Sequence, residues 1–371
     1  MRLSAHKDNV MAAVVVLLTV VACSLGVAYT SAEPPADPRY SKYEFGNGKN
    51  VINVGIQPMY LPTNIITEVM RCDAVLYDML KDLGMEIRFF PFSKGRDVNY
   101  FLLRGDLQVG VGGDMPAIVA TSTDKVVVAS LMQYGFTSVV TKKHMRIKDL
   151  SGARIGYAFG SNAHYTLLSA MSIGGNIPKN VRLVKMEVTD MVAALRAHKI
   201  DAFAAWEPTV TEALVTLPGS DVIYSKVSSG FLYFGKDFYA SHPDAAEAIV
   251  ASELRALRWL KRSEQNLLTA ARWALDRQKS FSGKLSPLTP EQIAAIALKD
   301  LPGMNTDPRL PMGNFAQHGM MSEEFDFLKS IGFIPSEVSM DVVYKNFQPD
   351  IIRRIVNNPL KYKLNEYRYD R

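Results

Sequence analysis

Residues 147–165 read IKDLSGARIGYAFGSNAHY, and this stretch gives the strongest indication of the fold. Its middle, residues 155–159, is typical of a short strand, Gly160 of a turn, and the residues from Ser161 onward of a helix. A helix N-terminus presents unpaired N–H groups and the positive end of the helix dipole, so it suits an anion. The turn alone is equally consistent with an ordinary capped helix, in which Ser161 is the cap and His164 only covers the turn.

The segments on either side of this stretch alternate between short apolar runs and helical patterns. Such an alternation predicts an α/β fold, with mainly parallel sheets that helices cover on both faces. Residues 243–275 are almost wholly helical in pattern, and residues 290–301, 322–331 and 349–356 predict further helices. The strand-like runs are residues 51–56, 85–92, 107–111, 126–131, 153–158, 181–186 and 200–205.

Composition and charge exclude several classes of protein. A chain of 371 residues with 48% hydrophobic and 21% charged residues is long enough for two compact domains and is neither disordered nor collagen-like. A net charge of +5 over this length does not predict a nucleic-acid partner. The six histidines and two cysteines show no metal-ligand spacing, and no G-x-S-x-G motif occurs, so we expect no metal, no cofactor and no catalytic residues.

The first 32 residues predict an export signal. Residues 10–22 are strongly apolar and follow Arg2 and Lys7, which is the pattern of a secretory signal peptide. No later apolar run is long enough to span a membrane. We therefore expect the protein outside the cytoplasm, with any membrane attachment through its N-terminus.

The form of that attachment stays open among three alternatives. Residues 20–23, VVAC, fit a relaxed lipobox, which makes Cys23 a candidate lipidation site. Simple cleavage after Ala32 is the second alternative, and an uncleaved anchor is the third, because about 20 apolar residues span a bilayer. Residues 33–49, with three prolines near their start, predict a linker.

Two parts of the chain repeat one arrangement. In each, a helical pattern ends, a short strand follows, and a carboxylate stands at the strand's end shortly before a proline suited to open a helix. The carboxylates are Asp114 and Glu207. Ligands of open parallel sheets bind beyond the carboxyl ends of the strands, so the two carboxylates are expected on opposite walls of one crevice. The alternative is that each is a solvated residue at a helix start, where it complements the dipole.

Three motifs together resemble the ABC-importer substrate-binding proteins for nitrate, taurine and aliphatic sulfonates. Residues 147–156 resemble the family's "K-DLKGK-I" strand entry, residues 160–165 its "GSTAH" helix start, and residues 200–208 its "DA…W-P" segment. Residues 107–115 are similar to its "D…G-GD-P" strand. The resemblance extends over about residues 51–356 in the order of elements.

The resemblance implies a two-lobed, type II periplasmic-binding-protein fold with a helical C-terminal region, which closes around its ligand by a hinge. Lobe 1 would comprise residues 51–140 plus 231–357, and lobe 2 residues 141–230. Residues 358–371 would form a basic, solvated tail. A ligand that touches both lobes stabilises the closed state, which a membrane permease would recognise.

The resemblance also implies a set of ligand-binding residues, with the start of the helix at Ser161 as the anion grip. Trp206 is either a ligand contact or part of a core, and Ser229 either contacts the ligand or belongs to the hinge. Asn162 and Glu207 depart from the Thr and Asp common in the family, so the ligand need not be taurine or a simple alkanesulfonate. The expected set is Gln57, Pro58, Tyr60, Gly113, Asp114, Gly160, Ser161, Asn162, His164, Trp206, Glu207 and Ser229.

The implied function is capture of a small anionic or zwitterionic solute in the interlobe cleft, by a monomer that delivers it to an ABC permease. A ligand-sensing receptor for a membrane signalling protein is the alternative, followed by an enzyme on the same fold. Thiamine-pyrimidine synthases share the fold superfamily but carry a cysteine-rich iron-binding motif. This chain lacks that motif, because Cys72 is its only cysteine beyond the signal region.

Overall fold

The computed structural model describes residues 34–172, 180–301 and 310–369. The predicted export signal, with Cys23, lies outside these residues. The described chain forms two compact units. The large unit is built from residues 32–135, 229–322 and 339–371, and the small unit from residues 136–228 and 323–338.

The strands of the large unit form a mainly parallel sheet in the order β2, β1, β3, β8. The first three strands are parallel to one another, and β8 pairs with β3 in the antiparallel sense. The two longest strands, β4 and β8, contribute residues to both units. The bounds are β1 (Val51–Ile56), β2 (Glu86–Pro91), β3 (Val109–Gly113), β4 (Val126–Thr141) and β8 (Asp221–Gly235).

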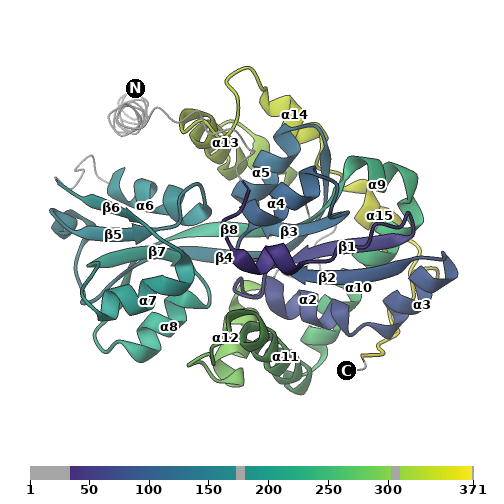
Figure 1. Ribbon diagram of the computed structural model, residues 1–371, viewed down its shortest axis with the longest axis horizontal. Helices are drawn as coiled ribbons and strands as arrows, with labels where there is room; N and C mark the ends of the chain where they lie inside the picture. Colours follow the sequence, from purple (N-terminus) through teal and green to yellow (C-terminus); the bar gives the residue numbers. More distant parts are fainter. Residues whose placement is uncertain (1–33, 173–179, 302–309, 370–371) are drawn as a thin grey trace. The chain divides into compact units, whose positions relative to one another are not determined.

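The helices of the large unit are η1 (Pro38–Lys42), α2 (Thr63–Arg71), α3 (Ala74–Asp82), α4 (Gly95–Leu103), α5 (Asp114–Ser122), α9 (Lys236–Ser241), α10 (Pro243–Arg262), α11 (Glu264–Ser282), α12 (Pro290–Asp300), η4 (Met312–Phe315), α14 (Met340–Lys345) and α15 (Asp350–Val356). Within this unit α4 and α5 lie on one side of β1 to β3, and α2, α10 and α11 on the other (Figure 1). The sheet is therefore covered on both faces, as the βα alternation predicts.

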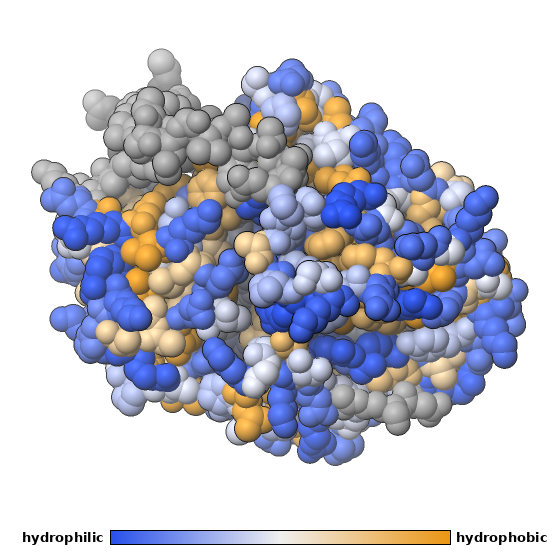
Figure 2. All heavy atoms as spheres, in the orientation of Figure 1, coloured by the Kyte–Doolittle hydropathy of each residue, from blue (hydrophilic) through white to orange (hydrophobic). Residues whose placement is uncertain are grey.

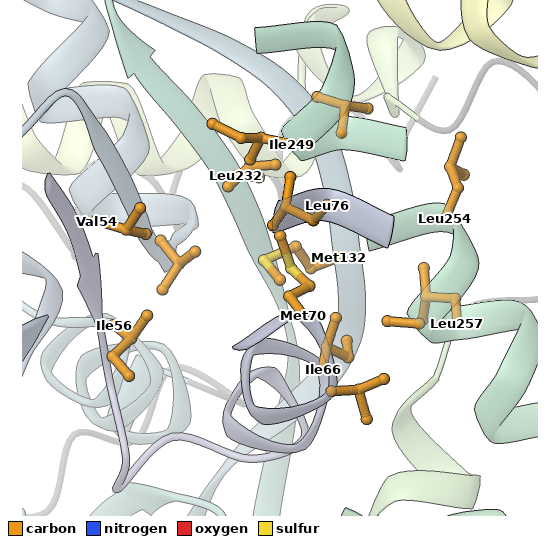
Figure 3. Close-up of a cluster of buried hydrophobic side chains, with 14 of the residues drawn as sticks. Val54, Ile56, Ile66, Met70, Leu76, Met132, Leu232, Ile249, Leu254 and Leu257 are labelled. Carbon is orange, nitrogen blue, oxygen red and sulfur yellow. The ribbon is translucent and has the colours of Figure 1, made fainter. Parts of the chain in front are cut away.

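The core of the large unit lies where β1 meets α2 and α10. Figure 3 shows Ile56 of β1, Ile66 and Met70 of α2, and Leu257 of α10 within one cluster of buried apolar side chains. On α2 and α10 the apolar residues recur at helical spacing, so each helix buries one face against the sheet. Burial of apolar side chains is the main favourable contribution to folding.

A fully buried ion pair lies inside this unit. The side chains of Asp73 and Arg255 are 0% exposed, and Arg255 Nη2 lies 2.6 Å from Asp73 Oδ2. The same carboxylate oxygen accepts a hydrogen bond of 2.6 Å from Ser252 Oγ, and Arg255 Nη1 donates to the carbonyl oxygen of Tyr362 at 2.8 Å. The pair therefore joins α3, α10 and the C-terminal segment.

The segment predicted as a linker is a folded part of the large unit from residue 34 onward. Tyr40 is buried, and its ring lies 5.0 Å from that of Phe92 and 5.8 Å from that of Phe101. Its hydroxyl donates to Asp97 Oδ2 at 2.8 Å. We call residues 34–45 the N-terminal strap. Tyr40 overrides the proline-rich composition because it fills an apolar site beside α4.

The C-terminal residues are also folded, in contrast to the predicted solvated tail. Tyr362 and Leu364 are 3% and 0% exposed. The ring of Tyr369 lies 4.7 Å from that of Trp259, which stacks on Trp273 at 5.8 Å. The aromatic residues between the basic ones, which charge counting disregards, bind this segment to α10 and α11.

The small unit has a second sheet in the order β4, β7, β5, β6, with β5 parallel to both β6 and β7 and β4 antiparallel to β7. Within this unit α6 lies on one side of the sheet and α7 and α8 on the other (Figure 1). The bounds are η2 (Ile147–Leu150), β5 (Arg154–Tyr157), α6 (Asn162–Ser172), β6 (Arg182–Lys185), α7 (Val188–Arg196), β7 (Ala202–Trp206), α8 (Thr209–Thr216) and α13 (Met320–Ser330).

The surface mixes polar and apolar residues. On the face in Figure 2, apolar residues are interspersed among hydrophilic ones, as is usual for globular proteins. Within the described residues, the helices are all too short or too polar to cross a lipid bilayer.

Candidate functional site

The predicted anion grip lies at the start of α6 in the small unit. Ser161 precedes the helix, and its carbonyl oxygen accepts from the N–H groups of His164 and Tyr165 at 2.9 and 3.3 Å. Its half-buried hydroxyl donates to the carbonyl oxygen of Ala158 at 2.7 Å. The N–H groups of a first helical turn have no partner within the helix, so the predicted strand, turn and helix start produce the local geometry that an anion requires.

Asn162 ties this helix start to the neighbouring strand of the same unit. Its Nδ2 donates to Ser228 Oγ on β8 at 2.6 Å, and the asparagine side chain is largely buried. The bond fixes the first residue of α6 relative to β8. The sequence names both residues but does not indicate that they meet, because 66 positions separate them.

His164 is a buried aromatic neighbour of the turn. It is 4% exposed, and its ring lies 4.7 Å from that of Tyr157, 5.1 Å from that of Phe159 and 5.3 Å from that of Phe327. Its Nδ1 faces the N–H of Gly160 at 3.4 Å. Desolvation by this burial lowers the pKa of His164 from 6.5 to about 3, so the ring is neutral near pH 7. Of the two roles considered for His164, the geometry favours covering the turn over adding positive charge to it.

This lowered pKa predicts a pH-dependent stability that an uncharged ring lacks. The folded protein keeps His164 neutral, whereas the unfolded chain takes up a proton as the pH falls below 6.5; stability is therefore present above pH 6.5 and lost as the pH falls toward 3. We expect the wild type to lose about 2 kcal/mol more than His164→Phe between about pH 8 and pH 5. Urea unfolding at both pH values measures this difference, and equal losses in the two proteins would contradict it.

The returning segment 323–338 covers the turn before α6. The ring of Phe333 lies 5.6 Å from that of Phe159, and a Cβ atom added to Gly160 would overlap it. Gly160 has a φ of +71°, a conformation that suits glycine. Glu323 accepts a hydrogen bond of 3.1 Å from the hydroxyl of Tyr165 on α6. The helix start is therefore bounded by an aromatic ring, which sequence reasoning missed because more than 150 residues separate the two segments.

Trp206 and Glu207 lie at the end of β7, also in the small unit. Trp206 is partly exposed and packs against the apolar cluster of this unit. The carboxylate of Glu207 accepts from the backbone N–H and the hydroxyl of Thr211, each at 3.0 Å. Glu207 thus holds the first turn of α8, which matches the role of a helix-start residue.

Asp114 stands at the corresponding place in the large unit and is fully buried rather than solvated. Its Oδ1 accepts from the N–H of Met115 at 3.0 Å, and its Oδ2 from the N–H of Ser229 at 2.9 Å. The carbonyl oxygen of Ser229 accepts from the hydroxyl of Tyr60 at 3.2 Å. The carboxylate therefore links the start of α5 to β8, and the structure brings Tyr60, Asp114 and Ser229 together.

Three more predicted residues lie at this edge of the large unit. Gln57 is buried and donates from Nε2 to the carbonyl oxygen of Val111 at 2.7 Å. Pro58, which follows it, is buried, and Gly113 pairs with Gly230. Gln57 thus fixes the loop after β1 to β3. Within the described ranges, no group of three or more His, Cys, Asp or Glu side chains is placed to hold a metal ion.

Solved structures with the same fold are known. The structure matches the periplasmic aliphatic sulphonate binding protein of Escherichia coli with a TM-score of 0.61 and 18% identity, over 81% of this chain and 93% of that one. It matches the periplasmic nitrate-binding protein of Synechocystis with a TM-score of 0.61 and 11% identity, over 84% and 90% of the two chains. The predicted periplasmic-binding-protein fold is therefore confirmed.

The amino-acid sequence has relatives as well. The chain is 28% identical over 235 residues to the taurine-binding periplasmic protein of Escherichia coli, which covers 58% of this chain and 73% of that protein. The family described as "NMT1/THI5 like" matches residues 79–265, just over half of the chain. The resemblance found in the motifs is thus confirmed, and this protein belongs to the NMT1/THI5-like family.

Proposed function

We propose that this protein is an extracytoplasmic solute-binding protein that captures a small anionic or zwitterionic solute and delivers it to an ABC importer. The observation that carries this proposal is the start of α6, where Ser161 and Asn162 are held in place by Ala158 and Ser228. The printed names of the relatives, which bind taurine, aliphatic sulphonates and nitrate, support a ligand of this size and charge.

In the proposed mechanism the protein binds and releases its ligand without breaking a bond. The first turn of α6 receives a sulfonate or similar group through its N–H groups and the Ser161 hydroxyl. Trp206 in the small unit, and Gln57, Tyr60 and Ser229 in the large unit, are proposed as further ligand contacts. His164 stays neutral, so the helix start supplies the favourable electrostatics on its own.

The remaining proposals concern cell biology. We propose that residues 1–32 direct export and that Cys23 is lipidated, so that the membrane is contacted only through the N-terminus. The protein is proposed to act as a monomer, without a cofactor and without catalytic residues. Its partner is the permease of an importer.

Thermal unfolding in the presence of taurine, ethanesulfonate, nitrate and glycerol tests the proposed function. A ligand that binds only the folded protein stabilises it by about 2.7 kcal/mol at a hundred times its Kd, so at least one of the anions or taurine is expected to raise the Tm. Glycerol, which carries no charge, is expected to leave it unchanged.

Two serine variants, studied by titration calorimetry with the ligand found, locate the site. Ser161→Ala is expected to weaken binding by about tenfold, because a hydroxyl donor to an anion is lost. Ser122→Ala is the matched control, since its half-buried hydroxyl also donates to the carbonyl oxygen three positions earlier, at 2.8 Å, but at the end of α5. Equal losses in both variants, or no ligand that raises the Tm, would contradict the proposal.

A further inference from the structure

The large unit offers little negative charge to a ligand at its strand ends. Both oxygens of Asp114, the carboxylate expected to receive a cationic group, accept backbone N–H groups. A carboxylate that accepts such bonds is already stabilised by fixed donors, so an ammonium group gains less from it. The polarity of this edge is therefore set by other residues.

The turn between β2 and α4 brings positive charge to the same edge. A Cβ atom added to Gly95 would lie 2.7 Å from Cγ of Pro116 and 3.6 Å from Nε2 of Gln57. The turn thus packs directly on the start of α5 and on the loop after β1. Gly95 is flanked by Lys94 and Arg96, both of which are half-buried.

The N-terminal strap holds this turn from outside. The N–H of Ser93 donates to the hydroxyl oxygen of Tyr40 at 2.8 Å, and Ser93 Oγ donates to Asp37 Oδ2 at 3.0 Å. On the other side of the turn, Asp97 accepts from the hydroxyl of Tyr40. Asp37 also binds Arg39, and its hydrogen bonds with Arg39 lower the pKa of this carboxyl to about 2. The two acidic side chains nearest the turn in sequence are therefore engaged by strap residues.

A second, independent observation indicates a ligand at this edge. Ser229 is fully buried, and among the described residues its Oγ has no hydrogen-bond partner. Its backbone is fixed at both ends, because its N–H donates to Asp114 and its carbonyl oxygen accepts from Tyr60. Buried hydroxyl groups almost always have partners, so this one awaits an acceptor or donor from a bound molecule.

From these observations we propose that Lys94 and Arg96 recognise a second anionic group of the solute. The inference rests on the proposed function and deepens it. The substrate class is then a small dianion, such as a sulfonate that also carries a carboxylate, rather than a zwitterion. One anionic group binds at the start of α6 and the other at the turn between β2 and α4, with Ser229 Oγ as an additional donor.

Three ligands of similar size and different charge test this inference by titration calorimetry: sulfoacetate, isethionate and taurine. Each has a sulfonate, and the other end is a carboxylate, a hydroxyl or an ammonium group. The wild type is expected to bind sulfoacetate at least about tenfold more tightly than taurine, with isethionate between them, because charge-assisted hydrogen bonds to a carboxylate are strong.

The double variant Lys94→Gln/Arg96→Gln is expected to bind sulfoacetate about tenfold more weakly and taurine no more weakly than the wild type. Arg96→Lys, which keeps the charge, is expected to retain most of the affinity. The matched control is Lys279→Gln/Lys284→Gln, which removes the same charge from exposed positions of the same unit. Urea unfolding of each variant shows whether it is folded.

The outcomes separate the inference from the proposed function. If taurine binds and sulfoacetate binds more weakly, or if the Lys94→Gln/Arg96→Gln variant weakens all three ligands equally, the inference is wrong and the proposed function stands. If none of the three ligands nor nitrate binds the folded wild type, the proposed function itself fails.

Discussion

An Arg255→Met variant is expected to lose about 3–5 kcal/mol of its free energy of unfolding, because it leaves Asp73 charged and unpaired in the core. Asp73 is fully buried, and Arg255 supplies two of its hydrogen bonds through Nε and Nη2. The variant also frees the carbonyl oxygen of Tyr362. Urea unfolding followed by circular dichroism measures the loss, and a Cm close to that of the wild type would contradict the prediction.

An exposed ion pair provides the control. Arg353 and Asp350 lie 2.8 Å apart on α15, with side chains 54% and 62% exposed. Exposed pairs contribute about 0–1 kcal/mol, so Arg353→Met should change the free energy of unfolding very little. A double variant, Asp73→Leu/Arg255→Met, should be more stable than Arg255→Met alone, because it removes the unpaired charge.

Gly160→Ala is expected to destabilise the small unit and to weaken ligand binding by about tenfold or more. A side chain in the left-handed region costs about 1–2 kcal/mol, and the added methyl group meets the Phe333 ring, which adds about 1–3 kcal/mol of overpacking. Because Gly160 precedes Ser161, any backbone shift that relieves the contact moves the start of α6. Urea unfolding and calorimetry with the bound solute measure the two effects.

Gly152→Ala separates the contact from the backbone strain. Gly152 has a φ of +74°, and a Cβ atom there would meet nothing within 4 Å. It should therefore show the strain alone and bind ligand as the wild type does. Adding Phe333→Ala to Gly160→Ala should recover part of the affinity; equal behaviour of the two glycine variants would contradict the role given to Phe333.

The strands were predictable because their signal is local. Runs such as 51–56 and 85–92 are short, apolar and followed by helical periodicity, and they form β1 and β2 with nearly the same bounds. The long helical pattern 243–275 is less reliable, because the structure divides it into α10 and α11 at Ser263. There the backbone is extended and the serine Oγ accepts from the N–H of Asn266, so a single cap ends one helical run and starts another.

The segments that the sequence describes poorly are those whose placement depends on distant partners. The strap and the C-terminal residues look like solvated ends by composition, yet Tyr40 and Tyr362 are buried. The segment 323–338 has ordinary helical periodicity, which does not indicate that Phe327 and Phe333 pack beside α6. Periodicity reports which face of a helix is apolar and not which surface covers it.

The candidate site was predictable in position and less so in polarity. The motifs place Ser161 before a helix and Asp114 after a strand, and both lie there. Whether a carboxylate faces a ligand depends on which N–H groups reach it, and the N–H of Ser229 comes from a strand 115 residues away. The same holds for His164, whose neutrality follows from aromatic neighbours on three different segments.

The hydrogen bond from Arg255 to the carbonyl oxygen of Tyr362 has a consequence for biosynthesis. That carbonyl belongs to one of the last residues to leave the ribosome, while Arg255 and Asp73 emerge much earlier. The charged pair therefore lacks one of its acceptors until translation is nearly finished. A nascent chain in this condition remains unfinished and exportable, and it completes its interior only after release.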